Sequence, residues 1–201
     1  TSYTVTGIDG NGCQGSGSFN LTANPLPTVT LTSTPANTSL TPGISVTLKA
    51  TVTPAGLFSY VWRRNGVVIP NTADSLVVTV DQIGSYTVEA VDAGGFCNRT
   101  SDAITVTDRP SSTIFIWPNP NNGNFTVSYY NSVNNTAQSN RNTISVFDAK
   151  GSRIFDKAYT VAQGYNLMKV NLRGLQSGAY YVVLRDGYGK RIASAGIFVK
   201  P

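Results

Sequence analysis

Apolar and polar residues alternate with a period of two in one segment after another of this 201-residue chain. Val46, Leu48 and Ala50 alternate with polar neighbours. Further strand-like segments occur at 60–64, 76–80, 125–129, 144–146, 168–172 and 180–184. Because the side chains of a strand point alternately to opposite faces, this period predicts half-buried β-strands. The chain is therefore predicted to be all-β.

Turn residues separate these segments. Asn65-Gly66 is a strong signal for a two-residue hairpin, because both positions of a type I′ turn need positive φ. Further turn signals are Asn121-Asn122-Gly123, Ala149-Lys150-Gly151 and Asp186-Gly187. Beyond an exposed linker at 109–113 we count about seven strands in about 88 residues with no helical period, which favours an antiparallel sandwich.

An internal repeat divides the first half of the chain. The sequence SYTVTGIDGNGC at residues 2–13 returns as SYTVEAVDAGGFC at 85–97, with one residue inserted. Both copies continue through polar residues into a strand, at 18–22 and at 103–107. A repeat of this length indicates tandem modules. We expect residues 1–24 to be the last hairpin of one module and residues 25–108 to form a complete copy.

The composition argues against catalysis. The chain has no histidine, Glu89 is its single glutamate, and 12% of its residues are charged. Without histidine no Ser-His-Asp triad can form, and no phosphate-binding or metal-spacing motif occurs. Lysine- and carboxylate-based chemistry stays open. We expect no enzyme activity, no cofactor and no metal, and we interpret Asp9, Asp81 and Asp92 as turn residues in preference to calcium ligands.

Charge differs between the two halves. Residues 1–110 hold five Lys or Arg against seven acids, a net charge of −2, whereas residues 111–201 hold ten against three, a net charge of +7. A basic domain can bind nucleic acid or an anionic membrane, but these charges are dispersed and no RNA-binding motif accompanies them. We expect no nucleic-acid partner. The chain contains no run of 18 apolar residues, so the sequence predicts no membrane-spanning helix.

The N-terminus begins as if inside a strand and lacks both Met and a signal pattern. We therefore expect a fragment of a longer precursor, with its signal peptide upstream.

The complete copy at 25–108 resembles an immunoglobulin-like domain. Trp62 stands where the core tryptophan of that fold belongs, and Tyr86, in the Gly84-x-Tyr86-x-Val88 pattern, where the tyrosine corner belongs. No cysteine flanks Trp62, so Leu48 or Ala50, and Val88, would fill the usual disulfide positions. Gly178-x-Tyr180-x-Val182 repeats the corner pattern in the last part of the chain. We predict two tandem immunoglobulin-like antiparallel β-sandwiches, preceded by the last hairpin of a third.

Four blocks in the last 90 or so residues carry a second resemblance: 116–127, 144–154, 175–183 and 195–201. In order, spacing and position they resemble the type A C-terminal sorting domain of type IX secretion substrates. The resemblance implies a sorting domain at 114–201, after a linker at 109–113. It implies an export address for a secreted or cell-surface protein, carried through the periplasm and across the outer membrane.

The resemblance also implies partners and signal residues. A type IX translocon, an outer-membrane shuttle β-barrel and a sortase-type protease would act on the domain, with cleavage near Pro110, Ser111 and Ser112. The alternative for this linker is a flexible spacer. The signal would be carried by Pro118, Asn119, Pro120, Gly123, Gly151, Gly178, Tyr180, Val199, Lys200 and Pro201.

The first of these blocks also has a physical reading. Pro118 and Pro120 fix φ and remove two backbone donors, so the segment should be extended and cannot pair as a central strand. Gly123 should supply a positive φ at the first hairpin. A plain turn at the start of the domain is the alternative. Lys190, Arg191 and Lys200 form either a solvated face or a patch read by the export machinery.

Two smaller features remain. Related repeats pair a cysteine at the position of Cys97 with one where this chain has Pro42 and Gly43, so we expect a free, buried thiol. Pairing with Cys13 would need Cα atoms within about 7 Å.

Asp74-Ser75-Leu76 resembles an O-glycosylation sequon of the Bacteroidota, with Ser75 as acceptor, but a turn before a strand explains it as well.

A different class of function stays open as an alternative. An adhesive or carbohydrate-binding module would use exposed aromatic rings as stacking platforms, and the candidates are Tyr60, Trp62 and Trp117. Trp62 lies in mid-strand and favours the core.

Overall fold

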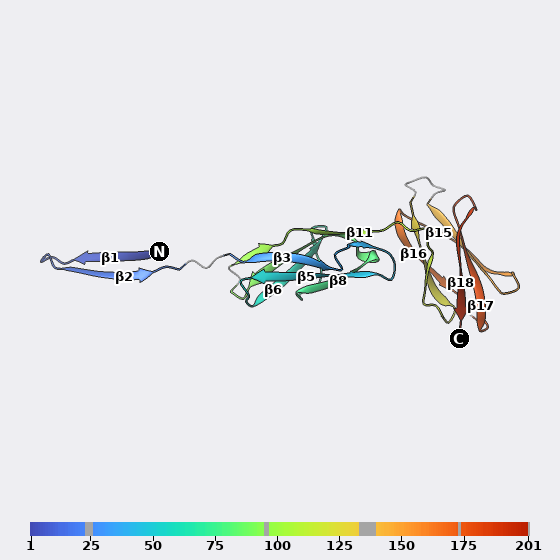
Figure 1. Cartoon of the computed structure of the whole chain (residues 1–201), viewed down its shortest axis with the longest axis horizontal. Helices are drawn as coiled ribbons and strands as arrows, with labels where there is room; N and C mark the ends of the chain where they lie inside the picture. The colour runs from blue at the N-terminus through green and yellow to red at the C-terminus, as the bar shows by residue number, and fades with distance from the viewer. Residues whose placement is uncertain (23–25, 95–96, 133–139, 173, 201) are drawn as a thin grey trace.

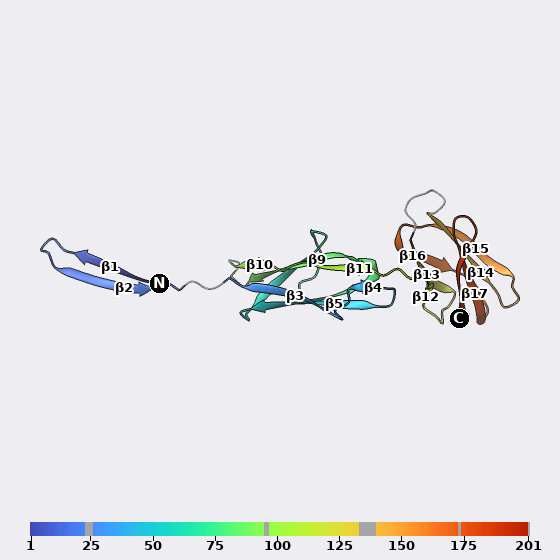
Figure 2. The ribbon, with the colours of Figure 1, turned by 45° about the horizontal axis from the view of Figure 1, so that its top comes forward.

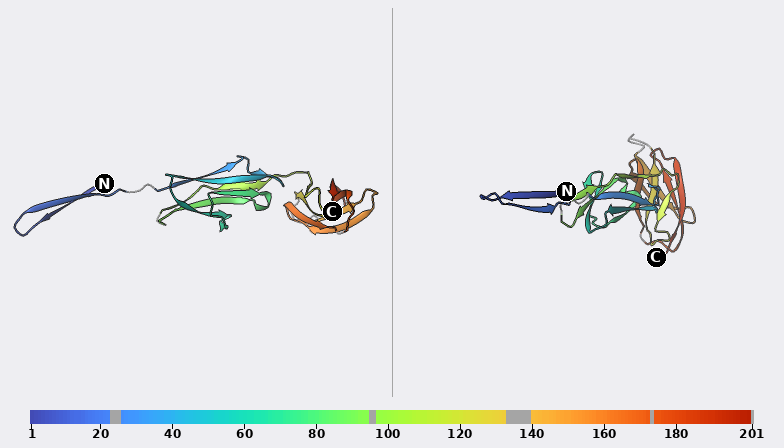
Figure 3. Two further views of the ribbon diagram at one scale, coloured as in Figure 1. Left: turned by 90° about the horizontal axis from the view of Figure 1, so that it is seen from below. Right: turned by 60° about the vertical axis from the view of Figure 1, so that its left-hand side comes forward.

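The computed structural model describes residues 1–22, 26–94, 97–132, 140–172 and 174–200, and it arranges them as three bodies in a row. Figure 1 shows a long hairpin, a first sandwich and a second sandwich along one axis. Figure 2 and Figure 3 give the same order from other sides. Within these residues the regular elements are strands and one short 3₁₀ turn, at Val80–Gln82. None of them forms a helix that is long and apolar enough to cross a membrane.

The N-terminal hairpin consists of β1 (Ser2–Ile8) and β2 (Gln14–Asn20). The two strands pair antiparallel along their whole length, with Tyr3 opposite Phe19. These two rings stack with centroids 5.4 Å apart, yet both faces of the hairpin are exposed.

The first sandwich packs two sheets. The first sheet has the order β3-β5-β8, and the second has the order β4-β11-β9-β6-β7 with β10 added to β9. The strands are β3 (Thr28–Thr34), β4 (Ser39–Leu40), β5 (Ser45–Thr53), β6 (Phe58–Arg64), β7 (Val67–Val68), β8 (Ser75–Thr79), β9 (Gly84–Asp92), β10 (Asn98–Thr100) and β11 (Ile104–Asp108). β4 pairs parallel with β11, whereas the other pairs are antiparallel. This strand order is that of an immunoglobulin-like sandwich.

The core of this sandwich surrounds the residues that the sequence singles out. Trp62 on β6 is fully buried, and its Nε1 donates to the carbonyl of Ala73 at 2.8 Å. The hydroxyl of Tyr86 donates to the carbonyl of Gln82, which makes the tyrosine corner. Burial of about 200 Å² of one such ring contributes roughly 5 kcal/mol at 25 cal/mol per Å². The predicted roles of Trp62 and Tyr86 are confirmed.

The predicted hairpin at Asn65-Gly66 is also confirmed. The two residues connect β6 to β7 with φ of 51° and 80°. The Asn65 side chain accepts a hydrogen bond from the amide of Ser85 at 2.8 Å, which ties the turn to β9.

The two copies of the internal repeat also pair their strands in the same register. Tyr3 pairs with Phe19, and its counterpart Tyr86 pairs with Ile104. In both copies an aspartate closes the turn that follows: Asp9 Oδ1 accepts from the amide of Cys13, and Asp92 Oδ1 from that of Cys97. The turn role predicted for these two aspartates is therefore confirmed.

The prediction for Cys97 was partly wrong. Cys97 and Cys13 are both free thiols, but Cys97 is half-exposed and not buried. It lies in the turn between β9 and β10, where its backbone amide and carbonyl are both bonded to Asp92. Its side chain therefore lies at the end of the sandwich and not between the sheets.

The described residues of the second sandwich form seven strands in two sheets, in agreement with the predicted number. The sheets have the orders β12-β13-β16 and β15-β14-β17-β18. The strands are β12 (Phe115–Trp117), β13 (Asn124–Asn131), β14 (Arg141–Phe147), β15 (Arg153–Thr160), β16 (Gly164–Asn171), β17 (Gly178–Arg185) and β18 (Arg191–Val199). They enclose a core of their own, which contains Val127, Ile144, Met168 and Leu184. The three-stranded sheet lies toward the first sandwich (Figure 2).

Candidate functional site

The first and last sequence blocks of the second sandwich lie side by side. β18 is an edge strand of its sheet, and the segment 118–121 runs along the free side of its end. The amide of Asn121 donates to the carbonyl of Phe198 at 3.0 Å, and the amide of Lys200 donates to the carbonyl of Asn121 at 2.7 Å. Asn121 and Val199 form a parallel bridge. We call the pairing of 118–121 with 196–200 the terminal clip.

Asn119 extends the terminal clip with its side chain. Its Oδ1 accepts from the amide of Phe198 at 2.9 Å, and its Nδ2 donates to the carbonyl of Gly196 at 3.4 Å. Pro118 and Pro120 on either side have no N–H to donate. The amide side chain therefore supplies the donor and acceptor that a backbone would supply in an ordinary ladder.

Gly123 anchors the other end of the segment. Its φ is 95°, as predicted, and a Cβ atom there would lie 2.1 Å from the carbonyl oxygen of Leu172. The amide of Leu172 donates to the carbonyl of Gly123 at 2.9 Å, and the amide of Gly123 donates to Asn121 Oδ1 at 2.8 Å. Only glycine fits both the conformation and the space.

Two other signal candidates lie next to the terminal clip. Gly178 pairs with Val199, and Tyr180 pairs with Ile197. The Tyr180 hydroxyl donates to the carbonyl of Gln176 at 3.0 Å, so the second tyrosine corner forms as predicted. Gly151 is elsewhere, in the turn between β14 and β15. Pro201 lies outside the described residues.

Exposure separates the candidates into two groups. Pro118, Asn119, Pro120, Gly151 and Lys200 are exposed, whereas Gly123, Tyr180 and Val199 are buried. A partner can touch the first group, while the second group shapes the fold on which the first is displayed.

Residues that sequence reasoning missed complete the site. Asn121 is buried and joins the segment to β18, and Phe198 is 46% exposed beside it. Asn121 bonds to β18 through its backbone, and its Oδ1 accepts from the amide of Gly123. The Asn-x-Gly spacing is the signal that could have indicated this turn, because an asparagine side chain often bonds to the amide two residues on.

The basic residues of the last strands do not form one patch. Lys190 and Arg191 lie where β18 begins and Lys200 just after it ends, and all three are exposed. A nine-residue strand is about 30 Å long, which is several Debye lengths at physiological salt. Within the described residues the salt bridges are Arg63–Glu89 and Arg153–Asp156, so these three cations are solvated.

The segment between the sandwiches is held at several points. The amide of Arg109 donates to the carbonyl of Leu40 at 2.7 Å, and the hydroxyl of Tyr165 donates to the carbonyl of Arg109 at 2.9 Å. Pro110, Ser111 and Ser112 line a hollow of about 290 Å³ together with Tyr129 and Tyr130. Pro110 and Ser112 are exposed.

Burial raises the pKa of Tyr165 above its ordinary value of 10.0. The nearby Asp108 and Tyr130 act in the same direction, while Ser111 and Arg109 oppose it. The hydroxyl therefore keeps its proton, and its bond to Arg109, throughout the physiological range.

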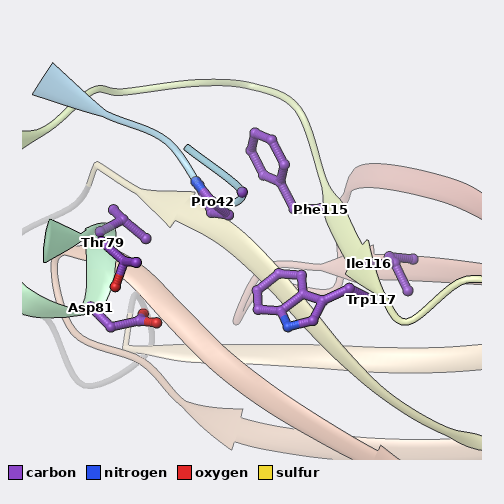
Figure 4. A pocket seen from close by; sticks show the side chains of 8 residues that line it. Pro42, Thr79, Asp81, Phe115, Ile116 and Trp117 are labelled. Carbon is purple, nitrogen blue, oxygen red and sulfur yellow. The ribbon is translucent and has the colours of Figure 1, made fainter. Parts of the chain in front are cut away.

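The aromatic candidates do not form a stacking platform. Trp62 is fully buried and thus unavailable to a ligand, and Tyr60 packs against the core of the first sandwich. Trp117 is 39% exposed and lines a cavity of about 380 Å³ between the sandwiches. Figure 4 shows its ring and that of Phe115 together with Pro42, Thr79 and Asp81 at this cavity.

Ser75, the candidate for O-glycosylation, is the first residue of β8 and pairs with Lys49. It is half-buried, and its carbonyl accepts a hydrogen bond from Asn71 Nδ2 at 2.9 Å.

Comparison with solved structures returns proteins with immunoglobulin domains and a cytokine receptor chain, all at low similarity. The N-terminal eight immunoglobulin domains of the Down syndrome cell adhesion molecule are 11% identical with a TM-score of 0.37, covering 99% of this chain and 26% of that one. The chicken interferon gamma receptor alpha chain is 11% identical with a TM-score of 0.34, covering 89% and 100%. Immunoglobulin domains 1–5 of Sidekick-1 are 16% identical with a TM-score of 0.26, covering 85% and 36%.

This chain thus spans about a quarter of the adhesion-molecule fragment. No curated protein matches the sequence. The immunoglobulin-like assignment therefore depends on the strand order and core described above.

The second sandwich has a family match of its own. Residues 115–195 match the model of the secretion system C-terminal sorting domain. The matched range runs from β12 into β18 and includes all of the segment 118–123. The C-terminal sandwich of this chain thus belongs to the C-terminal sorting domains, which mark proteins for type IX export to the cell surface or beyond it.

Proposed function

We propose that the second sandwich acts as a folded address, with the terminal clip as the part that the export machinery recognises. The observation that carries this proposal is the pairing of 118–121 with 196–200, which makes one surface out of two blocks about eighty residues apart. The partners would be the type IX translocon and an outer-membrane shuttle β-barrel. Asn119 and Lys200 are exposed polar groups in the clip, and the free start of β18 offers an edge to which a partner strand can add.

The remaining parts of the chain would be cargo. In this proposal residues 1–24 end a preceding module, residues 25–108 form a stalk module, residues 109–113 are the linker, and the sorting domain covers 114–201. A sortase-type protease would cut near Pro110, Ser111 and Ser112 once the domain has crossed the membrane. The absence of histidine from the chain supports a role in recognition without catalysis.

Export of a reporter tests the address. Residues 111–201 contain a complete hydrophobic core, so they are fused to a periplasmic fluorescent protein in a host that has this secretion system. We expect fluorescence at the cell surface or in the medium. Removal of Val199-Lys200-Pro201 should leave the reporter in the periplasm. Export of the truncated fusion at the full rate would contradict the proposal.

Two asparagines provide a matched pair for the terminal clip. Asn119→Ala removes both side-chain bonds to β18. Asn122→Ala removes bonds only to its neighbour Asn124. We expect the first variant to reduce export and the second to leave it unchanged. Equal export of the two variants would exclude the clip as the recognised element.

A further inference from the structure

The linker is latched by an aromatic cluster of the sorting domain. Tyr165, on β16, donates its hydroxyl hydrogen to the carbonyl of Arg109 at 2.9 Å. Its ring meets those of Phe115 and Tyr130 edge-on, with centroids 5.9 and 5.3 Å away. The other side of Tyr165 packs against the core of the first sandwich. One side chain thus contacts both sandwiches and the segment between them.

Gly164 allows this close approach. A Cβ atom at Gly164 would lie 2.7 Å from Asp108 Oδ2, at the end of β11. On the opposite side of the linker, the amide of Arg109 donates to the carbonyl of Leu40 at 2.7 Å. Both backbone polar groups of Arg109 are therefore engaged, one by each sandwich.

We propose that Tyr165 is a positioning residue that protects the linker from proteolysis until the two sandwiches separate. This inference rests on the proposed function, in which the linker is the processing site. A protease binds its substrate as an extended strand and needs free backbone N–H and C=O groups to do so. In the latched state the groups of Arg109 are occupied, and Pro110 has no N–H to offer. Cleavage near Ser111 and Ser112 therefore requires the latch to open.

The latch links processing to the arrangement of the domains. When the latch opens and closes fast relative to cleavage, the cleavage rate follows the fraction of molecules whose latch is open. Any partner that pulls β16 away from the first sandwich raises that population. Processing would then follow engagement of the sorting domain, and a chain still free in the periplasm would stay intact.

Limited proteolysis of the whole chain tests the latch. The purified 201-residue protein, Tyr165→Phe and Tyr159→Phe are digested with a broad-specificity protease, and cleavage within 109–113 is followed by mass spectrometry. Tyr159 is the matched control, because its hydroxyl also donates to a backbone carbonyl, that of Lys169 at 2.6 Å, but away from the linker. We expect Tyr165→Phe to be cut in the linker about fivefold faster, the ratio equivalent to about 1 kcal/mol for one hydrogen bond.

Two outcomes of this digestion overturn the latch. The first is a linker cleavage rate for Tyr165→Phe equal to those of the wild type and Tyr159→Phe. The second is faster cleavage throughout the chain, which would indicate general destabilisation. Amide exchange gives an independent measurement: the Arg109 amide should exchange faster in Tyr165→Phe, while core amides such as that of Val127 stay protected.

The failure of the proposed function gives a different result. If the wild-type protein is exported uncut by the secretion host, the processing site is wrong, yet faster linker cleavage in purified Tyr165→Phe than in the purified wild type would still show the latch. If processing occurs in the host but Tyr165→Phe and wild type are digested alike, the latch is wrong and the processing site stands.

Discussion

Single aspartates and glycines shape the turns of this protein. The Oδ1 atom of an aspartate accepts from the backbone amide four residues on in three turns: Asp9 with Cys13, Asp148 with Ser152 and Asp186 with Lys190. The third residue after each aspartate is a glycine with φ between 83° and 87°. This combination of an aspartate and a glycine three residues later recurs for a physical reason. The short carboxylate accepts a hydrogen bond that closes the turn, and glycine adopts the left-handed conformation without strain.

Glycine matters most where space is also lacking. We expect Gly123→Ala to destabilise the second sandwich by roughly 3 kcal/mol or more, because a positive φ and a clash with the carbonyl of Leu172 combine. Gly151→Ala is the control: its φ is also positive, but a Cβ there meets open space, so about 1 kcal/mol is expected. Thermal unfolding of the two variants measures the difference. Equal losses would refute the close approach at Leu172.

The contribution of the tyrosine corner to the stability of the first sandwich depends on pH. Burial raises the pKa of Tyr86 above 10.0, although Arg64 opposes the shift. A raised pKa in the folded state means that its stabilisation is complete below pH 10 and is lost as pH rises through the folded value. In an alkaline absorbance titration we expect a late-ionising component to which Tyr86 contributes. In Tyr86→Phe, the late-ionising component should be smaller by one tyrosine, because Tyr165, whose pKa is also raised, remains.

At the scale of elements, the last strand depends on a segment that is distant in sequence. β18 is an edge strand, and edge strands need a device that prevents unwanted pairing. Its end is covered by 118–121, whereas no segment among the described residues pairs with the free side of its start at Arg191. A proline-rich segment suits this role, because Pro118 and Pro120 offer no donor to a further strand.

Hydrogen exchange measures this cover. In Asn119→Ala the amide of Phe198 loses its acceptor, and we expect its exchange to accelerate about tenfold, the equivalent of about 1.4 kcal/mol for a lost hydrogen bond. Asn122→Ala should leave the Phe198 amide as protected as in the wild type. Unchanged exchange in Asn119→Ala would show that the backbone bonds of Asn121 alone hold the segment.

At the scale of the whole molecule, two hydrophobic cores lie in series. The core of the first sandwich contains Trp62 and Val88, and that of the second contains Val127 and Ile144. Between them lie the latch at Tyr165 and the cavity beside Trp117. A sorting domain with its own core can keep its shape whichever cargo precedes it, which fits a signal used for export to the cell surface.

Separate cores predict separate unfolding. We expect Val88→Ala to lower the transition temperature of the first sandwich, and Val127→Ala that of the second, since each fully buried side chain loses about 2 kcal/mol of burial. Differential scanning calorimetry of the whole chain resolves the two transitions. A single transition lowered equally by both variants would show that the sandwiches unfold as one unit.

Much of this fold could be predicted because its determinants are local. The period of two indicates strands, Asn65-Gly66 specifies a type I′ turn through its own backbone preferences, and the patterns around Trp62, Tyr86 and Tyr180 lie within one or two strands. The resemblance to the sorting domain could be recognised for the same reason, because it consists of short sequence blocks in a fixed order along the chain. Whether Cys97 is buried could not be read in this way, because burial depends on where the two sheets end.

The amino-acid sequence by itself determined the strands, their turns and the two core aromatic residues of the first sandwich, since each depends on neighbours in the chain. Only the tertiary structure decided that Asn119 and Asn121 bond to β18 and that Tyr165 holds Arg109. These contacts join residues 56 to 79 positions apart. Pairings over such separations follow from how the sheets pack, which no local pattern encodes.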